Sequence, residues 1–211
     1  MRKHHRLAHT FARVGAGAAS LVGFACDRSA PAAPPSPTVA TIPALHPPAS
    51  PKVVVAGVGN FAQISPHLYR GAQPTPEGFR ELEKMGIKTV INLRALHDDK
   101  NALRGTQLRY LRLRCNAWHP EQEDVEAFLQ LAANPENWPI FVHCQHGADR
   151  TGMMVATYRM VVQSWTLEAA IAELPEFGFH ELFATIRRYL RKMDIQKLHH
   201  AATVPLPVQK Q

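Results

Sequence analysis

Short apolar runs alternate along the chain with stretches in which apolar residues recur every three or four positions. The short runs are typical of strands and lie at 61–64, 68–70, 88–93, 108–115 and 140–142. Helical spacing predicts helices over 76–85, 123–133 and 151–163, a fourth helix capped by Thr166, and a last one from about His180. This order predicts an α/β fold whose central, mostly parallel mixed sheet is flanked by helices.

Two of these helices carry further signals. Thr75 is a typical N-cap, Pro76 fits the first helical position, and Gly86 is typical of a helix end. The last helix has one apolar stripe made of Leu182, Ile186, Tyr189, Leu190 and Met193. A strand over 108–115 is expected to place Leu111, Leu113 and Cys115 on one face.

Composition divides the chain into segments. Residues 31–51 hold eight prolines among small and polar residues, which predicts an extended tether without a core. We therefore expect an export signal over 1–26, a Pro-rich linker over 27–52, one folded domain over 53–200 and a disordered tail over 201–211.

The net charge of +7 is uneven along the chain. Residues 1–51 carry +4 of it, so the remainder is only mildly basic. No stripe of Arg and Lys interleaved with aromatic residues occurs, and this argues against nucleic-acid binding.

The first 26 residues have the pattern of an export signal. Arg2, Lys3 and Arg6 precede a small-residue apolar run over 14–25, which is too short to span a bilayer. The run ends LVGFAC, which resembles a lipoprotein cleavage box with Cys26 as the acylated residue. We expect an exported protein, periplasmic or membrane-anchored through Cys26. Ordinary signal cleavage and a disordered cytosolic extension are the alternatives.

The candidate chemistry lies in residues 139–157, PIFVHCQHGADRTGMMVAT. They predict a buried strand, a turn from Cys144 to Arg150, and a helix that begins at Thr151. The N–H groups of such a turn form an anion-binding nest, and the helix N-terminus adds positive potential. Arg150 can grip two phosphate oxygens, and the same field favours a nucleophilic thiolate at Cys144.

Residues 143–152, HCQHGADRTG, resemble the HCxxGxxRTG signature of the protein tyrosine and dual-specificity phosphatase superfamily. The resemblance extends over about 61–195 and is to compact, atypical dual-specificity phosphatases. It implies a cysteine-phosphatase fold with the phosphate loop between a strand and a helix. The alternatives at this point are a metal site built from His143, Cys144 and His146, or a plain strand-to-helix turn.

The resemblance also implies roles for individual residues. Cys144 would attack phosphorus and form a phosphocysteine, Arg150 would hold the phosphoryl oxygens, and Thr151 would steady the thiolate as it leaves. His143 would orient the loop. The phosphate-binding residues would be Gln145, His146, Gly147, Ala148, Asp149 and Arg150. No metal and no organic cofactor is implied.

The general acid is less clearly marked. The superfamily places an aspartate some thirty residues before the nucleophile, and this chain has none there. Asp149 is one candidate, because a Gly-x-Asp-Arg-Thr ending resembles myotubularins and certain bacterial phosphatases; its alternative role is a helix N-cap. The upstream candidates are His119, Glu121 and Asp124, of which Asp124 could simply be a first-turn acid of its helix. The pattern slightly favours Asp149.

Cys115 and Cys144 are the cysteines that would remain after processing at Cys26. A reversible disulfide between them could protect the nucleophile in an oxidising compartment. The alternative, which we favour, is that Cys115 is a small buried apolar residue.

The sequence therefore favours a phosphomonoester phosphatase acting on phosphotyrosine, phosphoserine or phosphothreonine proteins. A phosphoinositide or inositol phosphate substrate is the alternative within this class. A phosphate-binding pseudophosphatase, or an enzyme of sulfur transfer or arsenate reduction, would belong to other classes. The partner is then a phosphorylated protein, inositol or lipid, and we expect a monomer.

Overall fold

The computed structural model describes residues 49–203, and its centre is a five-stranded sheet. The strands are β1 (Ala62–Ser65), β2 (Leu68–Gly71), β3 (Thr89–Asn92), β4 (Arg109–Arg112) and β5 (Ile140–His143), in the spatial order β1-β2-β5-β3-β4. Only the β1–β2 pair among them is antiparallel. The predicted mixed, mostly parallel sheet is confirmed.

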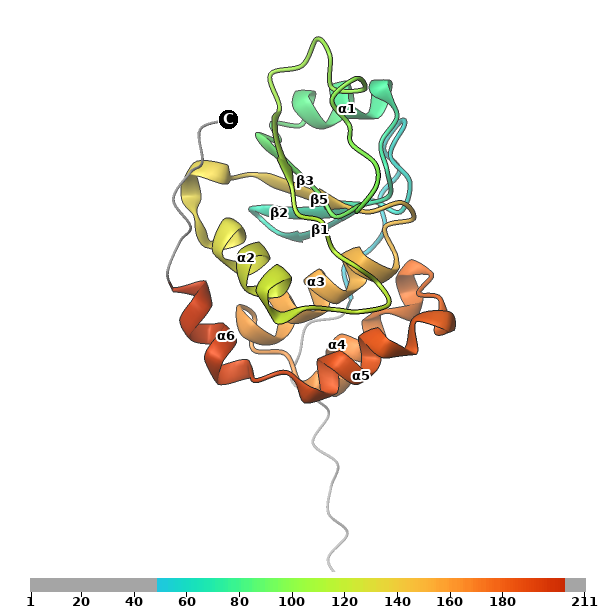
Figure 1. Cartoon of the computed structure of the whole chain (residues 1–211). Helices are drawn as coiled ribbons and strands as arrows, with labels where there is room; N and C mark the ends of the chain where they lie inside the picture. The colour runs from blue at the N-terminus through green and yellow to red at the C-terminus, as the bar shows by residue number, and fades with distance from the viewer. Residues whose placement is uncertain (1–48, 204–211) are drawn as a thin grey trace, which may run out of the picture. The chain divides into compact units, whose positions relative to one another are not determined.

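Helices cover both faces of the sheet (Figure 1). Helix α1 (Pro76–Lys84) lies on one face. The other face carries α2 (Gln122–Ala133), α3 (Asp149–Val161), α4 (Leu167–Glu173), α5 (Ala184–Lys192) and α6 (Ile195–Ala202). Short 3₁₀ turns occur at Pro135–Asn137, Pro175–Phe177 and Glu181–Phe183.

Helix α1 forms where the sequence predicts it. The Thr75 side chain accepts a hydrogen bond from the N–H of Gly78, and Pro76 occupies the first helical position. Phe79 and Leu82 of this helix belong to a small core between α1 and the sheet, which also includes Phe141 of β5.

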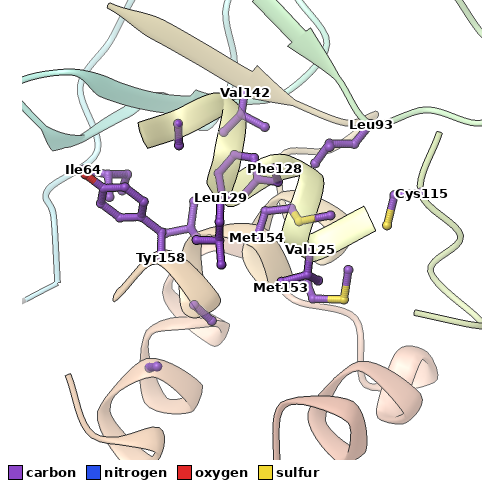
Figure 2. Close-up of a cluster of buried hydrophobic side chains, with 14 of the residues drawn as sticks. Ile64, Leu93, Cys115, Val125, Phe128, Leu129, Val142, Met153, Met154 and Tyr158 are labelled. Atoms are coloured by element: carbon purple, nitrogen blue, oxygen red, sulfur yellow. The ribbon is translucent and has the colours of Figure 1, made fainter. Parts of the chain in front are cut away.

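The larger core lies on the opposite face, and Figure 2 shows part of it. Val125, Phe128 and Leu129 of α2 pack there against Met153 and Met154 of α3. Helix α3 contacts β2 and β5 as well as α2, α4, α5 and α6. A helix covered on all sides has no polar face, and every residue of α3 except Arg150 is buried.

The register of the parallel strands gathers their carboxyl ends at one edge. Asn92 at the end of β3 lies opposite His143 of β5, and Gly71 of β2 lies on the other side of His143. In parallel sheets this edge is where ligands bind. The residues that follow β2, β3 and β5 therefore meet there.

Several predicted boundaries are wrong. The strand expected over 108–115 forms only as β4, an edge strand whose four residues are all half-buried. The residues after it are not paired as a strand, but Leu113 still packs on the core and Cys115 is buried. Helix α3 begins two residues before Thr151.

The last helix is also not continuous. It begins at Ala184, ends at Lys192, and is followed by α6, because Met193 is extended and Asp194 caps a new helix by accepting from the N–H of Lys197. Leu182 is exposed rather than part of the apolar stripe. Helix α6 extends to Ala202, so the first two residues of the tail expected to be disordered over 201–211 are helical.

At the other end, the described residues include 49–52, the last part of the predicted linker. The Ser50 hydroxyl accepts a hydrogen bond from buried Arg159, and Lys52 forms a bridge with Ala62. The predicted export signal, Cys26 and the linker up to residue 48 lie outside the described residues. Within 49–203, no helix has the length and apolar character needed to cross a bilayer.

Candidate active site

A tight loop connects β5 to α3 and begins with Cys144, which is almost fully buried. Gly147 within it has φ of +69°, a left-handed conformation that glycine adopts without strain. A Cβ at Gly147 would also collide with the backbone of Gly71 and Ala72. Both facts explain why the motif requires glycine here.

Three successive carbonyl groups of this loop accept hydrogen bonds from residues outside the loop. The carbonyl oxygen of Gln145 accepts from the N–H of Gln73 at 3.1 Å, and that of His146 from the side chain of Asn60 at 3.2 Å. The carbonyl of Gly147 accepts from Arg70 at 2.6 Å. Since C=O and N–H of a trans peptide point in opposite directions, the following N–H groups turn toward the inside of the loop. This is the anion-binding nest that the sequence predicts.

Arg70 is the strongest of these supports. Its side chain is buried on β2, and its guanidinium stacks 3.6 Å from the ring centre of Phe177. Burial lowers the pKa of Arg70 to about 10, partly offset by the charges of Glu173 and Cys144. Arg70 therefore keeps its charge at neutral pH and adds a fixed cation behind the loop.

His143 is buried at the end of β5 and is fixed from two sides. Its Nε2 lies 3.0 Å from Asp99 and its Nδ1 lies 3.2 Å from the carbonyl oxygen of Cys144. A carboxylate can only accept, so Nε2 donates to Asp99. The predicted orienting role of His143 thus has a structural basis, and Asp99 is its partner.

Asp99 is itself the centre of a buried network. It accepts from Gln73 at 2.6 Å and from Asn92 at 2.8 Å, and its own N–H donates to Tyr110. Burial acts to raise the pKa of Asp99, but the hydrogen bond and charge of His143 and the hydrogen bond from Gln73 hold it below its usual value. The carboxylate is therefore ionised at neutral pH and ties the segment after β3 to the loop.

A cavity of about 330 Å³ opens beside the loop. It is lined by Arg94, Ala95, Leu96, His97, Gln145 and Arg150. The Nε of Arg150 is buried and has no hydrogen-bond partner among residues 49–203. Arg150 is thus the one residue of α3 that is not enclosed by the core, and it faces a space open to a ligand.

Thr151 follows Arg150 and is completely buried in the first turn of α3. Its hydroxyl has no hydrogen-bond partner in the part of the chain that the structure describes. A buried hydroxyl without a partner costs free energy, which fits a group kept for a ligand or a reacting atom.

Asp149 does not act as the cap of α3. The N-cap is Ala148, without a side-chain bond, so the N-cap alternative for Asp149 is wrong. The buried Asp149 carboxylate accepts instead from the backbone N–H of His180 at 2.8 Å, and the ring Nδ1 of His180 lies 2.9 and 3.1 Å from its two oxygens. Both carboxylate oxygens are thus engaged by His180.

The upstream candidates differ in exposure. His119 and Glu121 are exposed, as is the neighbouring Glu123, whereas Asp124 at the start of α2 is half-buried, with the thiol of Cys115 as its neighbour. Burial first, and then the charges of the two neighbouring glutamates, raise the pKa of Asp124.

Cys115 is a buried member of the main core and is labelled in Figure 2. Burial and the charge of Asp124 raise its pKa to about 12. Cys115 and Cys144 are both free thiols here. Since thiolates carry out disulfide exchange, these surroundings favour the packing role over the predicted redox role.

The metal site considered from His143, Cys144 and His146 does not form among the described residues, since the His143 ring is bonded to Asp99. Sequence reasoning missed Asp99, Arg70, Asn60 and His180. Of these four, only Arg70 could have been noticed in the sequence. It stands two positions after Leu68 in a strand, so this charged residue shares the core-facing side with Leu68.

Comparison with known proteins gives a consistent set of relatives. Residues 61–197 match the family model described as "DSP-PTPase phosphatase fused to NAD+ Kinase". The dual specificity protein phosphatase TpbA of Pseudomonas aeruginosa is 34% identical over 146 residues, which cover 67% of this chain and 66% of that protein, just under two thirds of its length. An inositol diphosphatase of Arabidopsis thaliana is 26% identical, over 67% of this chain and 75% of its own length.

Solved structures give the same result. The crystal structure of P. aeruginosa TpbA superposes with a TM-score of 0.66 at 31% identity and covers 74% of this chain and 98% of that one. A further TpbA structure is a complex with phosphotyrosine and has the same TM-score and identity. These matches confirm the resemblance that residues 143–152 indicate.

The loop geometry leads to a test at Gly147. Gly147→Ala should abolish most phosphate binding, because the new methyl group must displace the loop from Gly71. Gly105→Ala is the matched control: Gly105 has φ of +85° but open space around it, so this variant carries only the left-handed strain of about 1–2 kcal/mol. Titration calorimetry with inorganic phosphate and thermal unfolding measure the two effects. Equal phosphate affinity in both variants would contradict the close packing of the loop.

Proposed function

Since the chain belongs to the DSP-PTPase phosphatase family, we propose that it hydrolyses phosphomonoesters through a phosphocysteine intermediate. The observation that carries this proposal is the loop itself. Three carbonyl groups anchored by Gln73, Asn60 and Arg70 turn the loop amides toward the space beside Cys144. Arg150 lines the adjoining cavity, and its buried Nε has no hydrogen-bond partner among residues 49–203.

In the first step the Cys144 thiolate attacks phosphorus, and the bond to the leaving oxygen breaks. The loop amides and Arg150 stabilise the equatorial oxygens as negative charge shifts onto them. In the second step water attacks the phosphocysteine, and phosphate and the thiolate are released. The buried Thr151 hydroxyl is free to donate a hydrogen bond to that thiolate.

For the leaving-group proton we propose Asp124. A general acid must hold its proton near the working pH, and burial and neighbouring glutamates raise the pKa of Asp124. Its neighbour Cys115 belongs to the same buried core cluster as Cys144, which supports a place for Asp124 on this side of the domain. Asp149, although favoured by the sequence, has both oxygens engaged by His180.

Phosphotyrosine, phosphoserine and phosphothreonine proteins are the proposed substrates. TpbA, which is named a dual specificity protein phosphatase and has been solved with phosphotyrosine, supports this choice. Inositol phosphates are a second candidate, because Arg94, His97 and Arg150 line one cavity and could bind several phosphate groups of one ring. The inositol diphosphatase among the relatives is in line with this alternative.

Activity on an aryl phosphate should need no added metal. We expect Cys144→Ser to lower turnover on the order of 10³-fold or more, because the nucleophile is lost. Arg150→Ala should lower it about 10²–10³-fold, with partial recovery in Arg150→Lys, which keeps the charge but not the planar fork. Arg188→Ala, at an exposed arginine of α5, is the matched control and should retain activity.

The same assays separate the alternatives. Phosphotyrosine peptides should be the best substrates of the wild type, whereas a preference for inositol polyphosphates would select the second candidate. Phosphate binding without turnover on any ester would identify a pseudophosphatase. Full activity of Cys144→Ser, or abolition of activity by a chelator, would contradict the cysteine mechanism.

The acid is tested with leaving groups of different basicity. Asp124→Asn should slow alkyl phosphates such as phosphoserine about 10²–10⁴-fold, and activated aryl phosphates much less. A general acid works only while protonated, so its pKa sets the limb on which activity falls as pH rises. That limb should disappear in Asp124→Asn. His119→Asn and Glu121→Gln serve as neighbouring controls. A leaving-group-dependent loss in Asp149→Asn, with none in Asp124→Asn, would assign the acid to Asp149 instead.

We further propose that the chain is exported and that the part of the linker before residue 49 tethers the domain to a membrane through acylated Cys26. The basic start, the short apolar run and the LVGFAC box support this. Cell fractionation and mass spectrometry of the full chain should find processing at or before Cys26, with acyl chains on that cysteine. An unprocessed cytosolic protein that begins at Met1 would refute export.

A further inference from the structure

Two histidines and one aspartate meet on the flank of the phosphate loop. His146 lies in the loop, Asp149 is the first residue of α3, and His180 precedes the 3₁₀ turn before α5. One ligand atom from each lies within 4.8 Å of the others. Asp149 is buried, whereas His146 and His180 are exposed to solvent.

The hydrogen bonds between Asp149 and His180 do not account for His146. The ring of His146 lies with its centre 5.3 Å from that of His180, tilted by 57°, and neither histidine ring stacks flat on the other. His146 therefore has a ring nitrogen within 4.8 Å of the Asp149 carboxylate and the His180 ring but takes no part in the hydrogen bonds between them. Two imidazoles and one carboxylate, from the phosphate loop with the start of α3 and from the segment at His180, are a ligand set suited to Zn²⁺ and related metals.

We propose that His146, Asp149 and His180 bind a divalent transition metal of the Zn²⁺ type, and that this metal restrains the phosphate loop. Nothing in the catalytic cycle requires the ion. It is a regulatory ligand that acts on the loop through His146 and Asp149.

The geometry needs only a local movement. With metal–ligand bonds of about 2.0–2.1 Å, tetrahedral ligand atoms lie about 3.3 Å apart. Nδ1 of His180 and Oδ2 of Asp149 are already 2.9 Å apart, so His146 has to approach them, and its exposed ring can rotate to do so. The backbone N–H of His180 can keep its bond to Oδ1 of Asp149 and hold the carboxylate in place.

Positive charges near the three ligands limit the affinity of this site for a metal ion. The N-terminus of α3 and the guanidinium of Arg150 both oppose a cation, although the charge of Arg70 is directed to the carbonyl of Gly147 and the ring of Phe177. We therefore expect reversible binding at micromolar metal rather than a permanent structural ion.

Binding would link the loop to the segment around His180. The loop has to receive and release phosphate in each cycle, so a link that stiffens its flank should lower turnover. This consequence rests on the proposed phosphatase function, but metal binding itself does not.

The test uses the full chain, freed of metal and titrated with Zn²⁺ and, separately, with Co²⁺. Equilibrium dialysis should find a site of micromolar affinity that weakens about 10–100-fold in His180→Gln and in His146→Gln. His199→Gln, at an exposed histidine of α6, is the matched control and should bind like wild type. Circular dichroism of the metal-free variants checks that they are folded.

Cys144→Ser separates this site from metal capture by the nucleophile. We expect this variant to bind Zn²⁺ as wild type does, and the Co²⁺ complex of the wild type to lack the charge-transfer absorption of a thiolate ligand. The proposal is overturned if binding is absent, if it survives both histidine substitutions, or if it is lost in Cys144→Ser. Turnover measured in parallel should fall on addition of Zn²⁺ in wild type and not in His180→Gln.

Discussion

The outward direction of three carbonyl groups is the constraint on which the site depends. A loop that binds an anion with its amides must leave its carbonyls on the other side, and buried carbonyls need donors. Gln73, Asn60 and Arg70 supply these donors from three places around β1 and β2. Without them the amides could not converge, and the loop would carry unpaired polar groups.

The same constraint explains the tight packing of the loop against β2. Gly147 comes so close to the backbone of Gly71 and Ala72 that the loop has no room for a side chain at this contact. Behind it, the stack of Arg70 on Phe177 joins the loop to the turn after α4. The phosphate site is thus supported both by β2 and by the turn after α4, which gives the fixed geometry that an anion site requires.

Sequence reasoning found the parts that local patterns specify. Thr75 and Pro76 mark the start of α1, and the spacing from Cys144 to Thr151 marks the loop. It missed contacts that depend on strand order, such as Asp99 with His143, 44 residues apart, and Asp149 with His180, 31 residues apart. No local signal distinguishes these residues from ordinary loop residues.

The prediction of one continuous last helix, in place of α5 and α6, was wrong for a different reason. The apolar stripe runs up to Met193, and neither Gly nor Pro interrupts it. A cap at Asp194 ends one helix and starts the next, and the packing of both on α3 fixes the turn. Asp124 shows the same limit at the site, because nothing in its position in the first turn of α2 indicates that it is half-buried beside Cys115.

The most direct test of the account is to trap the intermediate. Wild-type protein mixed with a phosphotyrosine peptide and quenched in acid within one turnover should carry one phosphoryl group. Mass spectrometry of its peptides should place that group on Cys144. Rapid turnover with no covalent phosphate, or phosphate on another residue, would contradict the central claim that this loop presents Cys144 as the nucleophile.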